Sequence, residues 1–309
     1  MATDTPPPTG VLLMAYGTPA SPDDIESYYT HVRRGRPPTP ELLAELRSRY
    51  DAIGGTSPLL ERTRAQAAGL QAALGGGYHV ELGMKHAPPF IEDGIAHLRD
   101  LGIDQAVGVV LAPHYSVLSI GEYAGRARAT PEVEGGALEM TFVESWHLEP
   151  GYLQLLADRV RDAVTSLGPC GRVEVVFTAH SLPARLLGTG DPYADQLAAT
   201  AQAVAALLGL AAHHVAWQSA GRTPEPWIGP DLLSVLPQLA ADGAGGVVVC
   251  PAGFVSDHLE VLYDLDVEAT TAAANLGIAF ARTASLNDDP IFCTTLSGVV
   301  AAHAAHLRQ

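Results

Sequence analysis

The sequence predicts an α/β fold of two similar Rossmann-like domains, each built on a parallel four-stranded sheet that is flanked by helices. Three observations predict it: a length of 309 residues, a regular alternation of short apolar runs with helical stretches, and a repeat that relates the two halves. A chain of this length exceeds one ordinary core and fits two domains of about 150 residues. Strand–helix alternation implies parallel sheets with helices on both faces.

Short apolar runs mark the expected strands, and longer stretches with apolar residues at helical spacing mark the expected helices. The strands are expected at 10–16, 78–84, 106–113 and 139–145 in the first half, and at 173–179, 213–219, 245–251 and 278–285 in the second. The helices are expected at 25–35, 41–50, 61–74, 194–210 and 230–243. We expect a disordered leader at 1–9 and domains at 10–148 and 149–309, with a last helix at about 290–309 that could pack back on the first domain.

An internal repeat supports two like halves. When the chain is shifted by 138 residues, 98–123 lies over 236–261 without a gap and 10 of 26 positions are identical. The identical pairs include Glu122 and Glu260. Composition alone would give only a few identities, although any helix–strand–proline unit in a chain rich in Ala and Val could look alike.

The first strands of the two halves also match, with LLMAYGTP (12–19) over VFTAHSLP (176–183). This alignment pairs Tyr16 with His180, so each domain is expected to place one polar ring at the carboxyl end of its first strand. That end of an open α/β sheet borders the ligand crevice. We therefore predict one cleft between the domains, with Tyr16 and His180 on opposite walls and room for a flat ligand.

Acidic residues follow the strand at 245–251. Glu260, Asp264 and Glu268 recur every fourth residue and would form one stripe on a helix, where like charges destabilise it unless solvent or a cation compensates. A solvated helix face is the simpler interpretation. The expected nearness of His180 instead favours a base oriented by the Glu260 carboxylate, or two ligands of a divalent metal. A core histidine bonded to backbone remains the alternative for His180.

Arginines in the first half indicate an anion site. The chain has 18 basic residues, and Arg33 and Arg49 belong to two small clusters of them, in HVRRGRPP and ELRSRYD. Arginine forks suit planar carboxylates, and Thr18, Tyr50 and Ser57 could add neutral donors. A solvated basic loop is the alternative, while phosphate is disfavoured because neither a GxxxxGK[ST] nor a GxGxxG loop is present.

The overall composition excludes several classes of protein. A net charge of −16 argues against a nucleic-acid partner and against docking on anionic membranes. No apolar run reaches the ~18 residues that span a bilayer, and the N-terminus lacks the pattern of a signal peptide. Three scattered cysteines support neither disulfides nor an iron–sulfur cluster. We expect a cytoplasmic protein without membrane insertion.

Seven stretches in one order carry a resemblance to a known family. They are LLMAYGTP, YYTHVRRGR, RYDAIGGTSPL, VLAPHYS, TAHSLP, WQSAGRTPEPWIGPD and GFVSDHLEVLYD. Along essentially its whole length the chain resembles the ferrochelatases, which implies a chelatase-like fold. It is most similar to the Gram-positive branch that inserts Fe²⁺ into coproporphyrin III, with Tyr16 as the main sign. Two stretches, MKHAPPF and SAGRTPEPW, depart slightly from the family's usual sequence.

The resemblance implies roles for individual residues. His180 corresponds to the family's metal-binding and proton-accepting histidine, Glu260 to its carboxylate partner, and Tyr16 to an axial ligand of the product iron. Asp264 and Glu268 continue an acidic ridge on a π-helical stretch. The positions that match contacts to the propionates or the macrocycle edge are Tyr16, Thr18, Arg33, Arg49, Tyr50, Ser57 and Tyr123.

The predicted function is insertion of Fe²⁺ into coproporphyrin III to form coproheme, with release of two protons, in heme b biosynthesis. The alternatives are a protoporphyrin IX ferrochelatase, a non-catalytic heme or coproheme carrier, and a cobalt or nickel chelatase of the same fold. Fe²⁺ is expected as a substrate, with no organic cofactor. We also expect a monomer that transiently contacts the enzyme receiving the product.

Overall fold

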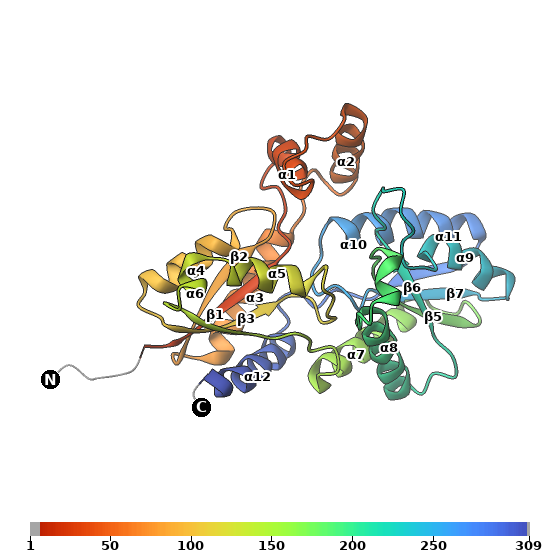
Figure 1. Ribbon diagram of the computed structural model, residues 1–309. Helices are drawn as coiled ribbons and strands as arrows, with labels where there is room; N and C mark the ends of the chain where they lie inside the picture. The colour runs from red at the N-terminus through yellow and green to blue at the C-terminus, as the bar shows by residue number, and fades with distance from the viewer. Residues whose placement is uncertain (1–6, 308–309) are drawn as a thin grey trace.

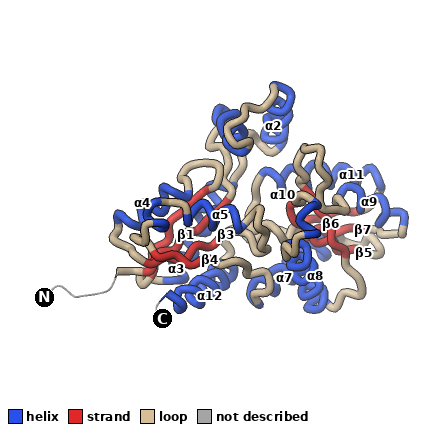
Figure 2. Tube along the Cα trace, in the orientation of Figure 1, coloured by secondary structure: helices blue, strands red, loops and turns tan. Residues whose placement is uncertain are grey.

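The computed structural model describes residues 7–307 and contains two parallel four-stranded sheets. The first sheet holds β1 (Thr9–Ala15), β2 (Tyr78–Met84), β3 (Gln105–Val110) and β4 (Glu139–Phe142). The second holds β5 (Val173–His180), β6 (His214–Gln218), β7 (Gly246–Cys250) and β8 (Ala279–Arg282). Figure 2 shows the two groups of strands lying apart, each among helices. The predicted fold class is confirmed.

The helices alternate with these strands along the chain. In the first half they are η1 (Pro22–Asp24), α1 (Ile25–Val32), α2 (Pro40–Ala52), α3 (Leu59–Leu74), α4 (Ile91–Asp100), α5 (Ile120–Arg128) and α6 (Pro131–Glu134). Later come α7 (Pro150–Ser166), η2 (Ala184–Gly188), α8 (Tyr193–Leu208), α9 (Leu232–Ala241), α10 (Leu259–Tyr263), the π-helix η3 (Asp264–Ala269), α11 (Thr270–Leu276) and α12 (Pro290–Leu307).

Both sheets have the same strand order, β2-β1-β3-β4 and β6-β5-β7-β8. The first strand of each half is therefore central and is buried along nearly its whole length, whereas the edge strand β2 is only partly buried. In such a sheet the chain leaves the central strands in opposite directions, and ligands bind outside the carboxyl ends at this switch point. Tyr16 directly follows β1, and His180 ends β5.

The two sheets have the same strand order, as the repeat predicts, but their strand pairing does not follow the register of the repeat. The two gapless alignments make Leu12 equivalent to Val176 and Gly108 equivalent to Gly246. In the structure Leu12 pairs with Gly108, but Val176 pairs with Val249, three residues beyond Gly246. Strands rich in valine match almost equally well at neighbouring registers, so sequence identity alone did not fix the register.

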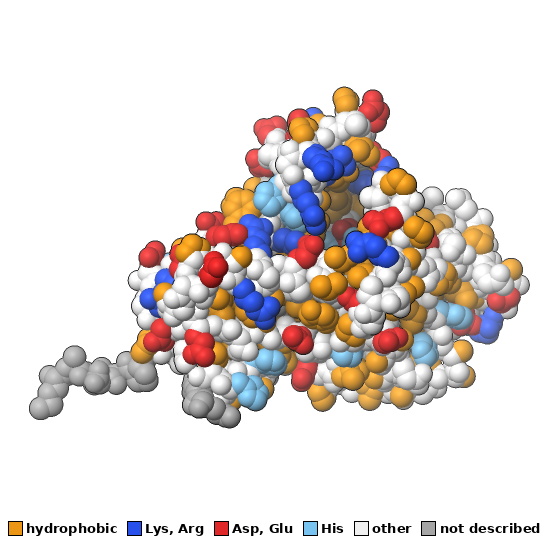
Figure 3. Space-filling model, viewed as in Figure 1, with side chains coloured by type: hydrophobic (Ala, Val, Ile, Leu, Met, Phe, Trp, Pro, Cys, Tyr) orange, Lys and Arg blue, Asp and Glu red, His pale blue; other side chains and the backbone are white. Residues whose placement is uncertain are grey.

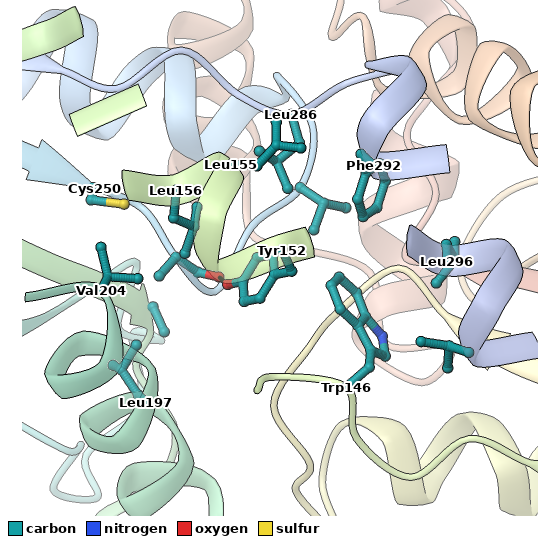
Figure 4. Close-up of a cluster of buried hydrophobic side chains, with 14 of the residues drawn as sticks. Trp146, Tyr152, Leu155, Leu156, Leu197, Val204, Cys250, Leu286, Phe292 and Leu296 are labelled. Atoms are coloured by element: carbon teal, nitrogen blue, oxygen red, sulfur yellow. Dashed lines mark hydrogen bonds between the residues drawn. The ribbon is translucent and has the colours of Figure 1, made fainter. Parts of the chain in front are cut away.

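One hydrophobic core joins the two sheets. Its buried side chains come from β1 and β3 of the first sheet and from β5 and β7 of the second. Trp146, in the loop before α7, and Tyr152, in its first turn, lie between the halves, and Phe292 and Leu296 of α12 complete the contact (Figure 4). The Tyr152 hydroxyl donates a hydrogen bond to the Ala252 carbonyl. The halves predicted at 10–148 and 149–309 therefore share a core, and their boundary stays a prediction.

Several expected boundaries differ from the structure. The leader expected at 1–9 falls largely outside the described residues, and Thr9 already begins β1. The helix expected at 25–35 ends at Val32 because Arg34 and Gly35 adopt positive φ angles of 57° and 81°. Figure 1 shows α1 and α2 standing away from both sheets, over the space between them. These two helices cover the space between the carboxyl ends of the two sheets.

The last helix packs as part of the core. Within the described chain, α12 is the one helix whose length and composition would allow it to cross a membrane. It lies against α3, β3 and β4 of the first half as well as α7, with Phe292, Leu296 and Val300 buried. A core helix passes the same test of length and hydropathy.

Candidate active site

A cavity of about 900 Å³ lies between the carboxyl ends of the two sheets, beneath α1 and α2. Figure 3 shows a hollow under this projection, with Lys and Arg side chains gathered around it. Tyr16 and Glu122 line the cavity from the first half, and His180 and Glu260 line it from the second. The residues that the repeat pairs, Tyr16 with His180 and Glu122 with Glu260, thus all line this cavity. Its volume is within the range of ligand-binding sites.

Two hydrogen bonds, one to its carbonyl and one from its ring, hold His180 at the end of β5. The Tyr193 hydroxyl donates a 3.0 Å hydrogen bond to the His180 carbonyl. The ring Nδ1 lies 2.5 Å from the Ser181 carbonyl, which can only accept, so Nδ1 carries a proton. In the neutral imidazole the lone pair is then on Nε2, which lies 3.7 Å from Oε2 of Glu260. Gly253 lets the loop after β7 pack closely against the end of β5, since a Cβ there would lie 2.5 Å from Cβ of Ala179.

Glu260 stands in the first turn of α10 as an ionised carboxylate. Burial alone would raise its pKa, but His180 and His258 offset burial and lower the pKa to about 2. His258 Nε2 lies 3.8 Å from the same carboxylate, and its Nδ1 lies 2.9 Å from the Ser256 carbonyl. Sequence reasoning gave His258 little weight, although it stands only two residues before Glu260.

The acidic stripe continues along η3, where the resemblance implied π-helical geometry and the structure has it. π-Helical turns occur frequently at functional sites. Burial and the nearby Glu260 raise the pKa of Asp264 to about 6, against the hydrogen bond that Ser219 donates to it. Ser219 adopts a φ of 60°, a strained backbone angle for this residue.

A second cavity of about 400 Å³ adjoins the first, and Glu260 lines both. Asp264 and Glu268 line only the second one, which we call the acidic cavity. Arg49 belongs to this cavity as well, with its guanidinium 3.7 Å from the Asp264 carboxylate. The structure therefore places Arg49 beside the acidic stripe rather than among the residues that line the larger cavity.

Tyr16 forms the wall that faces His180. Gly17, with a φ of 91°, turns the chain sharply after it, and a Cβ at Gly17 would lie 2.9 Å from the Ala87 backbone nitrogen. The ring packs 4.6 Å from that of His86 and stays 41% exposed toward the cavity. Partial desolvation, followed by the negative charges of Glu260 and Glu122, raises the pKa of Tyr16 above its usual value. The phenol is thus uncharged in the free protein.

Neutral hydroxyl groups lie together in the first half of the larger cavity. Thr18 Oγ1 is 3.3 Å from the hydroxyl of Tyr50, and both side chains line the cavity with Ser57 and Tyr123. Burial raises the pKa of Tyr50 to about 12, although the Thr18 hydrogen bond opposes the shift. These four predicted residues therefore share one wall as uncharged donors.

The cations around the larger cavity are mostly not those predicted. Arg34, Lys85, Arg126 and Arg185 line it, whereas Arg33 does not and instead lies over the ring of Tyr29. Arg34 was adjacent in sequence to the predicted residue. Lys85 and Arg126 were missed because no local pattern predicts that the ends of β2 and α5 meet.

All four of these cations are paired with acids, Arg185 with Glu225 at 3.3 Å. Lys85 Nζ lies 2.5 Å from Glu122, which Arg34 also approaches at 3.5 Å. Arg126 forms a two-pronged contact with Glu92 at 2.6 and 2.7 Å. Lys85 and Arg126 are therefore held in position before any ligand binds, whereas Arg34 is 87% exposed and only weakly paired.

The site holds a metal-binding pair rather than a closed metal centre. Among residues 7–307, no three His, Cys, Asp or Glu side chains converge to hold a metal ion. Nε2 of His180 and Oε2 of Glu260, 3.7 Å apart, could both contact one divalent ion at about 2.1 Å. Such an incomplete set of ligands suits an ion that passes through the site and leaves with a product.

The fold and the site together define the class of protein. The fold is similar to that of SirB from Bacillus subtilis, solved with Fe³⁺, with a TM-score of 0.59 and 13% identity over 97% of each chain. It is equally similar to the sirohydrochlorin chelatase SirB from Bacillus subtilis subspecies spizizenii in complex with cobalt, with a TM-score of 0.59 and 13% identity over 97% of this chain and 96% of that one. At this identity the likeness concerns the chelatase fold alone.

The ferrochelatase family model matches residues 8–304, so the chain belongs to the ferrochelatase family and is a metal chelatase. A coproporphyrin III ferrochelatase of Anoxybacillus flavithermus is 45% identical over 95% of this chain and 96% of its own. That of Geobacillus kaustophilus is 44% identical over 94% of both chains. A ferrochelatase of Deinococcus radiodurans is 43% identical over 97% of both. The family predicted from the seven stretches is confirmed.

Proposed function

We propose that the protein inserts Fe²⁺ into coproporphyrin III to form coproheme, with release of two protons, in heme b biosynthesis. The observation that carries the proposal is that Tyr16 and the His180–Glu260 pair face one cavity from opposite halves of the chain. A macrocycle held between them would expose one face to a phenol and the other to a base. Relatives named coproporphyrin III ferrochelatases, at 43–45% identity, support the choice of porphyrin.

His180 and Glu260 act on the reacting nitrogens. Two pyrrole N–H bonds break as the ion forms bonds to the four ring nitrogens, so two protons must be accepted. Nε2 of His180 has the free lone pair for one proton at a time, and the ionised Glu260 beside it stabilises the imidazolium that forms. Once the imidazolium has released the first proton to the acidic stripe, Nε2 accepts the second. The acidic stripe of Glu260, Asp264 and Glu268 leads from there into the acidic cavity and provides a route for cations or protons.

Tyr16 serves the opposite face of the ring. Its phenol is uncharged in the free protein, because burial and two nearby carboxylates disfavour the phenolate. An iron ion in the macrocycle supplies the positive charge that favours ligation by a phenolate oxygen. We therefore assign Tyr16 as the axial ligand of the product iron.

The substrate carboxylates bind around the mouth. Thr18, Tyr50, Ser57 and Tyr123 offer neutral donors on one wall. Four cations line the cavity, namely Arg34, Lys85, Arg126 and Arg185. Coproporphyrin III carries four propionates, whereas protoporphyrin IX carries two, so four separate cations favour the former. The contacts of Arg33 and Arg49 with propionates remain predictions, since neither residue lines this cavity.

The remaining assignments complete the proposal. Fe²⁺ is a substrate, and the reaction needs neither an organic cofactor nor an iron–sulfur cluster, since ring and ion already contain every bond partner. We propose a cytoplasmic monomer that binds no nucleic acid, does not insert into membranes and transiently contacts the enzyme that receives coproheme. The net charge of −16 supports the absence of contact with nucleic acids and anionic lipids.

A comparison of rates on two porphyrins tests the proposal. Purified protein is incubated anaerobically with Fe²⁺ and either coproporphyrin III or protoporphyrin IX, and the collapse of four visible bands to two is followed. We expect kcat/KM to be about two- to thirtyfold higher for coproporphyrin III, because each of the two lost charged contacts at a surface costs about 0.2–1 kcal/mol. A higher value for protoporphyrin IX would make it the substrate. Tight porphyrin binding without any metal insertion would instead indicate a carrier.

A further inference from the structure

The acidic cavity leads from solvent to the His180–Glu260 pair. Carboxylates outnumber guanidinium groups in its lining by five to two. The five acids are Glu45, Asp231, Glu260, Asp264 and Glu268, and the two bases are Arg49 and Arg222. Glu260 also lines the larger cavity, which we call the porphyrin cavity, so the two cavities meet at the carboxylate that faces His180.

The residues that line the acidic cavity differ in exposure. The side chain of Asp264 is 9% exposed, that of Arg49 26% and that of Glu45 33%. Arg222 is 55% exposed and therefore lies at the outer end. Arg222 and Glu45 are thus closer to solvent than Asp264, and a cation that enters on their side meets them first.

Arg222 and Glu45 connect the two halves of the protein at this outer end. Arg222 stands in the loop between β6 and α9, which reaches up toward α2 in Figure 1. Its guanidinium forms an ion pair with the carboxylate of Glu45 on α2. The second oxygen of Glu45 lies 3.7 Å from Arg49, so both bases of the cavity hold the same acid.

We propose that Arg222 is an electrostatic gate that competes with the incoming metal ion for Glu45 and so sets the metal concentration at which the enzyme works. The inference rests on the proposed metal insertion. It assigns a role to Arg222 in SAGRTPEPW, a stretch that departs from the family's usual sequence. A guanidinium and a divalent cation cannot share the carboxylate without repulsion. While Arg222 is paired, the Glu45 carboxylate is neutralised and a positive charge stands beside the path of the ion.

Arg222 does not line the porphyrin cavity, and its ion pair is with Glu45 rather than with Glu260. The gate therefore acts on the metal alone. Removal of its charge should lower the KM for metal while kcat and the KM for porphyrin stay unchanged. If the ion pair served only to anchor the loop, its loss would instead disturb Trp227, which belongs to the same loop and lines the porphyrin cavity.

The test compares R222Q with a matched control. Arg161 of α7 forms a similarly exposed ion pair with Asp158 and neither residue lines either cavity, so R161Q removes the same charge elsewhere. We measure the KM for Fe²⁺ and Zn²⁺ with coproporphyrin III, and the Kd of Zn²⁺ by calorimetry without porphyrin. Exposed ion pairs are weak, so R222Q is expected to lower both values about two- to fivefold, while R161Q leaves them unchanged.

Two further variants sharpen the test. R222K keeps the charge and should restore the wild-type metal KM, and E45Q should raise it and abolish the effect of adding R222Q. Unchanged metal KM and Kd in R222Q, or equal shifts in R161Q, would overturn the gate. A wild-type protein that inserts no metal would overturn the proposed function instead, and the Zn²⁺ Kd values would still decide the gate.

Discussion

Nε2 of His180 lies 3.7 Å from Oε2 of Glu260, too far for a hydrogen bond but close enough for both atoms to contact one ion. The Ser181 carbonyl fixes the proton on the other ring nitrogen, so the lone pair faces the carboxylate. A second ring nitrogen that donates to a backbone carbonyl is also the usual arrangement of histidines that bind metals. The pair is thus ready to accept a proton or to hold an ion.

The first prediction concerns His180. We expect H180A to lower kcat about 10²- to 10⁴-fold, since a positioned base contributes that much to proton transfer. Coproporphyrin should still bind with a Kd within about threefold of wild type, because the propionate contacts lie elsewhere. Anaerobic insertion assays and porphyrin fluorescence titrations measure the two quantities. H306A on α12 changes an exposed histidine and should have no effect. Undiminished turnover in H180A would remove the base from the mechanism.

The second prediction concerns Tyr16. The Y16F variant should still insert metal, because the base is on the opposite wall, but its oxidised product should lack the phenolate-to-iron charge-transfer band. Absorption and resonance Raman spectra of the bound ferric product measure this. Tyr28 lines the same cavity, and its hydroxyl lies 3.3 Å from the Gly17 carbonyl, so Y28F is the matched control with an unchanged band. Identical spectra for Y16F and wild type would show that Tyr16 is no ligand.

Topology and the central pair of the site were predictable because they depend on local patterns. Strand ends can be read from apolar runs, and like folds bring the ends of β1 and β5 to one cleft, which placed Tyr16 opposite His180. Glu260 followed from its place after β7. The π-helical turn came only from the resemblance, since its four-residue acidic spacing equally predicts an ordinary helix.

The rest of the site depends on contacts between distant segments. Lys85 is held by Glu122, 37 residues later, and Arg126 by Glu92, 34 residues earlier, and neither pair has a local pattern. Arg34 rather than Arg33 lines the cavity because α1 ends at Val32 and Arg34 itself adopts a left-handed φ of 57°, which turns the chain at that residue. Likewise, the shared core around Trp146 depends on α12 returning to the first sheet.

The third prediction concerns the stability of the acidic stripe. Burial and Glu260 raise the pKa of Asp264 to about 6, above its ordinary value of 3.8, so ionisation costs folding free energy above pH 6. This cost fades as pH falls from 6 toward 4, where the carboxyl is protonated in the fold. D264N should therefore stabilise the protein by about 1–3 kcal/mol at pH 8 and much less at pH 4.

Urea unfolding at both pH values measures this effect. Asp266, on the same helical turn, is 42% exposed and forms an ion pair with Arg282, so D266N should be neutral or slightly destabilising at pH 8. Equal gains for D264N at both pH values would show that the carboxylate carries no burial cost.

The fourth prediction concerns the core that joins the halves. Phe292 is 1% exposed and its ring lies 5.8 Å from that of Trp146, whereas the neighbouring Ile291 is 58% exposed. F292A should lower the free energy of unfolding by about 3–5 kcal/mol, and I291A by less than about 0.5 kcal/mol. Because side chains of both sheets surround Phe292, unfolding should remain a single transition by fluorescence and circular dichroism. Two separate transitions in F292A would mean that the halves 10–148 and 149–309 unfold independently and that the shared core does not hold them together.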